Sequence, residues 1–228
     1  MAINYKNYHR DSDYERYTST FRNIFLTRFH LIKKYVKTGR VLEIGSSTGV
    51  FLELFKENGY EVFGVEPSES SRVAVKKGLT IYKGYFEKLT LPKNYFDVVV
   101  LNHTLEHMDD PVFVLNKVKT LLKDGGIVFV DVPNAGGLSA KIFGKNWPYR
   151  LPDEHKWQFT KKSIFTVFRK SGFRVIFWQS RSGVFEYANP FLELKRKSFF
   201  YDIITLPLAL VSTVLNMGDS MTIIARKV

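Results

Sequence analysis

Hydrophobic residues gather in short runs along the chain, separated by segments in which they recur at helical spacing. The first five runs are almost continuously apolar, which is typical of parallel strands buried on both faces of a sheet. The predicted strands are residues 40–45, 61–66, 80–84, 96–102, 126–133, 173–179 and 220–227.

The segments between these strands carry helix start and stop signals. A helix over 48–58 places its large apolar side chains on one side and ends at Gly59, because glycine readily adopts the conformation that follows a helix. Asp110 and Pro111 form a cap and first-turn pair for a helix that runs to about Leu122.

A turn at Asp124-Gly125-Gly126 leads into the fifth strand, and Thr160 can cap a helix that ends near Lys170. Strands and helices therefore alternate through most of the chain. This alternation predicts an α/β fold with an open, doubly wound, mostly parallel sheet and helices on both faces. Ligands of such sheets bind beyond the carboxyl ends of the strands.

Two segments depart from the alternation. Residues 134–159 form a long connection rich in Gly, Pro and aromatic residues, which favours an ordered, functional loop. Residues 203–217 are almost wholly apolar and predict a buried helix before the last strand, or a dimer contact. Together with the basic and aromatic residues that precede it, the wider segment 195–217 could instead lie on a membrane surface.

The composition narrows the functional classes. The 228 residues include no cysteine, which excludes disulfides, thiolate metal sites and cysteine nucleophiles. The N-terminus shows no apolar core of a signal peptide, so a cytoplasmic protein is expected, with peripheral membrane contact as an alternative. The net charge is +12, and residues 1–40 alone contain nine Lys/Arg against three Asp/Glu. Such a charge suits nucleic acid, anionic lipid or an acidic small substrate, and equally simple solubility.

The stretch VLEIGSSTG, residues 41–49, is a strand that ends in a carboxylate and a turn of small residues. Small residues let a ligand approach the backbone, and the helix that follows offers free N–H groups. Gly45 and Gly49 are four residues apart, whereas a dinucleotide fingerprint needs G-x-G-x-x-G. Glu43 at the mouth of the turn would repel a pyrophosphate and favours a cationic ligand.

Glu66 ends the next predicted strand, 23 residues after Glu43. An acid at about this distance commonly accepts the hydroxyls of a ribose. The ligand is therefore expected to contain a ribose and a positive charge. The simpler alternatives are that Glu43 caps the following helix and that Glu66 is a solvated surface acid.

These motifs belong to an ordered series: VLEIGSSTG (41–49), GVEPS (64–68), GYFEKL (84–89), FDVVVLNHTLEHMDDP (96–111), LLKDGGIVFVDVPN (121–134) and a final DSMTIIARK strand. In this order and spacing, residues 35–228 resemble the class I S-adenosylmethionine-dependent methyltransferases. The resemblance implies a seven-stranded sheet whose last strand is antiparallel. It also implies a helical cap or lid over 1–38 and a methyltransferase domain over 39–228, with an insertion at 134–159 and an apolar helical segment at 198–217.

The resemblance assigns cofactor contacts residue by residue. The residues implied to bind S-adenosylmethionine, with S-adenosylhomocysteine as product, are Glu43, Gly45, Ser46, Ser47, Gly49, Glu66, Pro67, Tyr85, Phe86, Asn102 and His103. Glu66 would accept both ribose hydroxyls, while Tyr85 and Phe86 would flank the adenine. Two positions depart from the family pattern. Ser47 replaces the usual middle glycine and fits if its backbone angles are ordinary, and Tyr85 stands where an acid often contacts the adenine amine.

Three histidines are candidate general bases for an oxygen nucleophile. His103 and His107 follow the fourth strand and are four residues apart, so they can share a face of one helical turn. His155 lies in the long connection. A histidine pair can also bind a metal ion, but a third ligand with clear spacing is missing from the sequence pattern, so no metal is predicted.

The long connection resembles that of small-molecule methyltransferases with a histidine and aromatic stretch before Phe-Thr. The candidate substrate-binding residues are Trp147, Tyr149, Arg150, His155 and Trp157. They suit an acceptor with an apolar or sugar face and an anionic group, and the alternative is that both tryptophans anchor the insertion.

The predicted function is methyl transfer from S-adenosylmethionine to a small molecule, with oxygen favoured as the acceptor atom. A sugar, a lipid-linked compound or a natural-product-like compound is the expected class of acceptor. The alternatives are an RNA methyltransferase and a non-catalytic module that binds a nucleotide-like ligand. Nucleic acid is disfavoured because base-specific amino-methyltransferases carry Asn/Asp-Pro-Pro-aromatic after the fourth strand, where this chain reads NHTL from Asn102.

Overall fold

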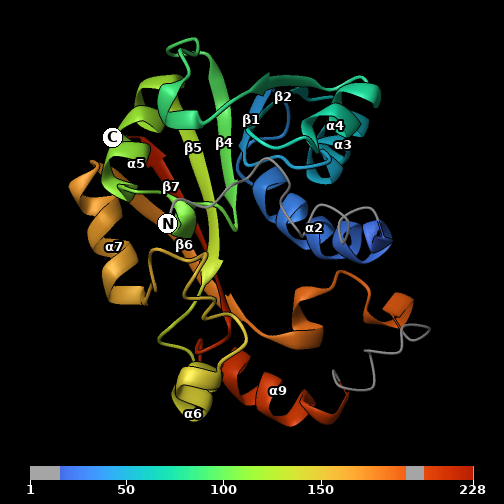
Figure 1. Ribbon diagram of the computed structural model, residues 1–228, viewed down its shortest axis with the longest axis vertical. Helices are drawn as coiled ribbons and strands as arrows, with labels where there is room; N and C mark the ends of the chain where they lie inside the picture. The colour runs from blue at the N-terminus through green and yellow to red at the C-terminus, as the bar shows by residue number, and fades with distance from the viewer. Residues whose placement is uncertain (1–15, 194–202, 228) are drawn as a thin grey trace.

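The computed structural model of the protein describes residues 16–193 and 203–227. Seven strands form one sheet in the order β3-β2-β1-β4-β5-β7-β6, with helices on both faces (Figure 1). The strands are β1 (Arg40–Ile44), β2 (Glu61–Glu66), β3 (Thr80–Lys83), β4 (Phe96–Asn102), β5 (Leu122–Pro133), β6 (Phe173–Arg181) and β7 (Ser220–Lys227). The α-helices are α2 (Thr18–Lys33), α3 (Val50–Glu57), α4 (Ser71–Lys76), α5 (Pro111–Leu121), α6 (Leu138–Phe143), α7 (Lys161–Lys170) and α9 (Leu206–Val214).

The strand directions confirm the predicted fold class. β1 to β5 pair in parallel, whereas β7 runs antiparallel to both β5 and β6. The strand order reverses between β1 and β4, and such a switch point opens a crevice at the carboxyl edge of the sheet. In Figure 1 the carboxyl ends of β4 and β5 point toward the part of the molecule that contains α6 and α9.

Alternate residues of the central strands supply two separate cores. Val41 of β1 faces the side covered by α2 and α3, whereas its neighbour Leu42 faces the side covered by α5 and α7. On the first side Phe51 is fully buried, stacked on Phe25 at 4.9 Å between ring centroids and 5.1 Å from the ring of Phe55. Because both faces are covered, the strands read as continuous apolar runs instead of alternating ones.

The sequence-based prediction for the start of the fifth strand is wrong. β5 begins at Leu122, directly after α5, and not at residue 126 after a turn. Phe96 pairs with Leu122 but Val98 pairs with Ile127, so the residues between form a bulge inside the strand. Gly125 and Gly126, which suggested a turn, lie in this bulge, and Gly125 has a φ of 75°.

Five 3₁₀ turns, η2 to η6, complete the described elements: η2 (Phe86–Lys88), η3 (Leu105–His107), η4 (Gly144–Asn146), η5 (Gly183–Glu186) and η6 (Pro190–Glu193). The predicted insertion 134–159 thus contains α6 and η4. The predicted cap over 1–38 contains α2, which packs on α3, while residues 1–15 lie outside the described part.

α9 follows β6 as the apolar segment predicted, but most of its large side chains are exposed, and only Ala209 and Ser212 within it are buried. The predicted segments 195–217 and 198–217 begin in residues outside the described part. Among the residues that the structure describes, no helix combines the length and apolar character needed to cross a bilayer. Contact of this segment with a membrane surface or a second chain stays a prediction.

Phe51→Ala is expected to lower the free energy of unfolding by about 3–5 kcal/mol, because it leaves a cavity among packed rings. Phe113→Ala on α5 is the control, since half of that side chain is exposed. We expect the control to cost less than about 1 kcal/mol. Denaturant unfolding of the two variants measures the difference, and equal losses would contradict this account of the core.

Candidate functional site

The turn after β1 is built from left-handed backbone conformations. Gly45, Ser47 and Gly49 have φ values of 77°, 45° and 80°. A side chain at Gly45 would place its Cβ 2.6 Å from the hydroxyl oxygen of Thr104, which itself donates to the Ile44 carbonyl at 3.0 Å. Ser47 was expected to fit this position if its backbone angles are ordinary, but its φ of 45° is left-handed. A glycine is usual at that position because a left-handed conformation costs a residue with a side chain about 1 kcal/mol.

Glu66 locks the turn to the end of β2. Its carboxylate oxygens accept the backbone N–H groups of Ser47 and Ser68, each at 2.8 Å. The side chain is buried, which excludes the interpretation of Glu66 as a solvated surface acid. Each oxygen of a carboxylate can accept a further hydrogen bond, so the fixed group is oriented to receive two hydroxyls.

Four buried polar atoms lie around this turn without a hydrogen-bond partner among the described residues. They are Glu43 Oε2 at the end of β1, Ser46 Oγ and Thr48 Oγ1 in the turn, and Asn102 Oδ1 at the end of β4. Burial, and secondarily the negative charge of Glu66, raises the pKa of Glu43 well above its ordinary value. Unsatisfied buried polar groups are costly, so this arrangement fits a bound ligand with a positive charge and hydrogen-bonding groups.

Tyr85 and Phe86 lie beyond the end of β3, where η2 begins. Tyr85 is 44% exposed, whereas Phe86 is buried. The Phe86 carbonyl accepts a hydrogen bond from the Lys117 ammonium at 2.7 Å. Their predicted role beside an adenine stays a prediction, as does that of Pro67.

His103 follows Asn102 at the carboxyl end of β4 with a φ of 51°, an uncommon conformation for a residue with a side chain. Its Nε2 lies 3.3 Å from Asp131 Oδ1 on β5, and its Nδ1 lies 3.5 Å from Glu106 Oε1 in η3. Burial opposes the charged imidazole, but the interactions with these two carboxylates prevail and raise the pKa of His103 to about 9. Strained backbone of this kind is common at functional sites.

A family model described as a methyltransferase domain matches residues 14–176 of the chain. The chain belongs to the class I S-adenosylmethionine-dependent methyltransferases. The resemblance based on the ordered motifs is thus confirmed, while the role of the glycine turn, Glu43 and Glu66 as cofactor contacts stays a prediction.

Individual relatives agree with the family but differ in their reactions. A C-methyltransferase, NovU, of Streptomyces niveus is 32% identical over 142 residues, which are 60% of this chain and 33% of that protein. A ubiquinone biosynthesis O-methyltransferase of Cereibacter sphaeroides is 31% identical over 146 residues, 58% of this chain and 59% of that protein. The chain thus matches less than two thirds of the length of either relative.

Solved structures share the fold. An S-adenosylmethionine-dependent methyltransferase from Thermotoga maritima has a TM-score of 0.67 at 22% identity, and the match covers 96% of this chain and 97% of that one. At such low identity the likeness shows the architecture alone.

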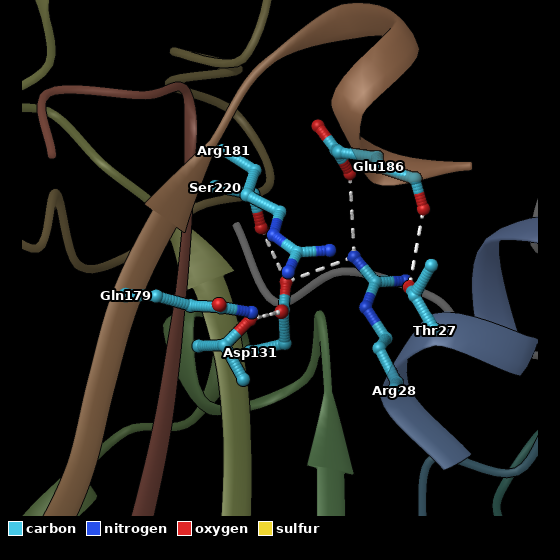
Figure 2. Close-up of a pocket in the computed structure, with 8 residues that line it drawn as sticks. Thr27, Arg28, Asp131, Gln179, Arg181, Glu186 and Ser220 are labelled. Carbon is cyan, nitrogen blue, oxygen red and sulfur yellow. Dashed lines mark hydrogen bonds and ion pairs between the residues drawn. The ribbon is translucent and has the colours of Figure 1, made fainter. Parts of the chain in front are cut away.

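On the other side of His103, the methyltransferase contains a polar cavity at the carboxyl edge of the sheet (Figure 2). Its lining residues are Thr27, Arg28, Asp131, Gln179, Arg181, Glu186, Ser220 and Thr222. Arg28 reaches in from α2 to Asp131 Oδ1 at 3.0 Å and to Glu186 Oε2 at 3.5 Å. Burial opposes ionisation of Asp131, but Arg28, His103 and Ser220 together lower its pKa below its ordinary value.

The segment that follows β6 packs against α2 beside this cavity. Asn23 donates to the Asn189 carbonyl at 2.8 Å and to Glu193 Oε1 at 3.0 Å, and Thr20 donates to Glu193 Oε2 at 2.9 Å. Thr27 donates to the Glu186 carbonyl at 3.1 Å. These hydrogen bonds hold residues 186–193 against α2 next to the cavity.

The other two candidate histidines meet on the opposite side of η3. Their rings lie 4.8 Å apart in an edge-to-face arrangement, although His107 and His155 are far apart in sequence. Trp157 brings them together, since its backbone N–H donates to the Glu106 carbonyl at 3.1 Å and its indole N–H to the Met108 carbonyl at 3.0 Å. Burial lowers the pKa of His155, which favours its neutral form.

Burial alone would raise the pKa of Glu106, but His103, and then the other two histidines, lower it below its ordinary value.

The predicted substrate-binding residues occupy different environments. Trp147 is buried and donates to Asp219 at 3.0 Å, whereas Tyr149 and Trp157 are 41% and 42% exposed. Arg150 is half-buried, and its carbonyl accepts from Gln158. Their contacts with an acceptor stay predictions.

Sequence reasoning did not place the charged residues that surround His103, although Arg28 was a candidate to line a lid. Arg28, Asp131 and Glu186 come from α2, β5 and η5, and the fold alone brings them together. One signal was available for Asp131, because an acid inside the otherwise apolar run GIVFVDVP is costly unless it is paired.

Glu186 provides a test of the cavity's electrostatics. Burial raises its pKa from 4.5 to about 7, a shift that Arg28 and His103 oppose and Asp131 and Asp219 reinforce. Between these two pH values the folded protein keeps a proton on Glu186 that the unfolded chain releases. The contribution of this proton to the free energy of unfolding is fully present below pH 4.5 and is lost as pH rises through 7. Glu186→Gln should remove this loss, which is about 2–3 kcal/mol at most between pH 5 and 8.

Urea unfolding of wild type and variant across this pH range measures the effect. Glu57→Gln serves as the control, because that exposed carboxylate lies on α3, outside the cavity. Parallel pH profiles for wild type and Glu186→Gln would refute the raised pKa.

Proposed function

We propose that this protein transfers the methyl group of S-adenosylmethionine to an oxygen atom of a small, hydroxyl-rich acceptor. The observation that supports this most is the position of His103, which directly follows Asn102 and lies 3.3 Å from Asp131 Oδ1 in the lining of the polar cavity. Methyl transfer needs two adjacent sites, one for the donor and one for the acceptor, in line with each other.

The donor site would be formed by the residues around the turn. Glu66 would accept the ribose hydroxyls, and Glu43, Ser46 and Asn102 offer unsatisfied polar atoms for the charged methionine part. The buried Glu43 would become ionised beside a cationic ligand, because an opposite charge lowers the pKa that burial raises. When bound, S-adenosylmethionine supplies a methyl group on a sulfonium that leaves as a neutral thioether.

The acceptor site would be the cavity beside Asp131. Donors from Arg28, Arg181 and Gln179 and acceptors from Asp131 and Glu186 line it, which suits a compound with several hydroxyls better than an apolar ring. The packing of residues 183–193 against α2 beside this cavity favours a small acceptor over a nucleic-acid strand.

His103 would contact the attacking oxygen, since it follows Asn102 of the proposed donor site and lies 3.3 Å from Asp131 of the proposed acceptor site. The proton of the acceptor hydroxyl must leave during the transfer. His107 and His155 lie next to His103 across Glu106 and are the candidate groups on the other side of η3.

Thermal unfolding with S-adenosylmethionine, S-adenosylhomocysteine and NAD, each alone, tests the donor site. At 100 times its dissociation constant a ligand stabilises the folded state by about 2.7 kcal/mol. We expect a shift with the two adenosyl compounds and none with NAD. Glu66→Gln should reduce the shift, whereas Glu61→Gln, at the exposed start of the same strand, should retain it.

Transfer of a labelled methyl group tests the acceptor. Wild type is incubated with labelled S-adenosylmethionine and either a panel of sugars and hydroxylated natural products or total RNA. Label in the small-molecule fraction, with a raised KM for the acceptor in Arg181→Ala, supports the proposal. Label in RNA alone would establish the nucleic-acid alternative instead, and cofactor binding without transfer to either would favour the non-catalytic module.

A further inference from the structure

The large apolar side chains of α9 are exposed to solvent, whereas its buried residues are small. Within the helix only Ala209 and Ser212 are buried, while Val214 is 72% exposed. The exposed apolar residues of α9 and of the position after it are Leu206, Leu210, Val211, Val214 and Leu215. A surface helix normally buries its large apolar residues and exposes its polar ones, so α9 has the reverse arrangement.

Polar contacts fix α9 in this orientation. Ser212 donates to the Ala209 carbonyl at 3.0 Å, and its hydroxyl lies 3.2 Å from that of Ser182 at the end of β6. The Thr213 hydroxyl accepts the backbone N–H of Ser182 at 3.2 Å. A rotation of the helix that buried its leucines would break the contacts with Ser182, so the apolar face remains outside.

α6 packs against α9 and adds further exposed apolar side chains (Figure 1). The backbone N–H of Leu138 at the start of α6 donates to the Met217 carbonyl at 2.7 Å, just beyond α9. Ile142 and Phe143 are 58% and 49% exposed. We call the exposed apolar residues of the two elements the α6–α9 patch, which consists of Ile142, Phe143, Leu206, Leu210, Val211, Val214 and Leu215. Large exposed apolar surfaces of this kind mark interaction sites.

The charges beside the patch are basic. Residues 203–217 contain no charged residue, and residues 138–147 contain Lys141 and Lys145 but no acid. Both lysines are exposed. Residues 195–202, outside the described part, contain three Lys/Arg and one Asp in sequence. Asp219 follows the patch, but its carboxylate accepts from Ser182 at 2.7 Å and from the indole of Trp147 at 3.0 Å.

This charge determines which partner fits. The whole chain has a net charge of +12, so two copies that met through this face would repel each other. An anionic lipid surface would instead attract the lysines, and its acyl region would accept the leucines and valines.

We propose that the α6–α9 patch docks on the surface of an anionic lipid membrane. The nine residues of α9 form a helix about 14 Å long, whereas a hydrocarbon core is about 30 Å thick. The helix therefore lies in the interface, with its apolar side chains between headgroups and acyl chains. Lys141 and Lys145 contact the negatively charged headgroups.

Docking would also bring the polar cavity close to the membrane. α9 contacts η5, and Glu186 of η5 lines that cavity. A hydroxyl-rich acceptor attached to a lipid would then reach the cavity from the membrane surface. This consequence rests on the proposed function, whereas the docking rests only on the patch and its charges.

Flotation of the full chain with lipid vesicles tests the docking. One set of vesicles is phosphatidylcholine alone, and the other is equal parts of phosphatidylcholine and phosphatidylglycerol. We expect at least tenfold tighter binding to the mixed vesicles. The double variant Leu210→Gln with Val214→Gln should bind them at least tenfold more weakly, because two apolar side chains no longer enter the interface. Lys141→Gln and Lys145→Gln should each weaken binding about fivefold.

The double variant Val75→Gln with Phe113→Gln is the matched control and should bind as wild type does. Its two apolar side chains are equally exposed but lie on α4 and α5, outside the patch. Equal unfolding temperatures of all variants without vesicles establish that they are folded.

No vesicle binding by wild type would overturn the proposal, as would equal binding by wild type and the Leu210/Val214 variant or equal binding to the two kinds of vesicle. A wild-type dimer in analytical ultracentrifugation that the variant loses, without vesicle binding, would show that a second copy covers the patch instead. The shift of unfolding temperature with S-adenosylhomocysteine separates the two proposals. Vesicle binding by a protein without that shift leaves this inference intact and refutes the proposed function alone.

Discussion

Asp131 is a buried negative charge on which the carboxyl edge of the sheet depends. Its oxygens accept from Arg28 on α2 at 3.0 Å, from Ser220, and from Thr222 at 2.5 Å, and His103 lies 3.3 Å away. Burial of an ion is unfavourable unless its partners are all in place. The assembly of α2, β4, β5 and β7 in one arrangement is thus coupled to the pairing of this carboxylate, and the polar cavity lies beside these paired groups.

The two halves of the proposed site differ in how their polar groups are satisfied. Around the turn after β1, Glu43 and Asn102 keep atoms without partners, whereas in the cavity Arg28 and Asp131 already bind each other. The first half therefore gains most from a charged ligand, since the ligand removes an existing cost. The second half can exchange hydrogen bonds with an acceptor only by loosening its own, which favours selectivity for a matching pattern of hydroxyls over high affinity.

Much of the fold was predictable because its signals are local. Parallel strands buried on both faces must be apolar, and the turn after β1 must be made of small residues. The start of β5 was mispredicted because a bulge and a turn use the same glycines, and only pairing with Phe96 distinguishes them. The exposure of α9 also could not be derived from its apolar sequence, since burial depends on what packs beside a helix.

For the site, the expected cofactor region was predicted from motifs whose order and spacing can be read along the chain. The position of His155 beside Glu106 could not be predicted in this way, because it depends on the hydrogen bonds of Trp157, which form across about fifty residues of sequence.

The small space between Gly45 and Thr104 limits which residues can replace them during evolution. A side chain at 45 would collide with the hydroxyl that anchors the Ile44 carbonyl, so the two positions cannot drift independently. Among descendants of a common ancestor, a larger residue at 45 should occur only with a smaller one at 104, as a correlated pair of changes.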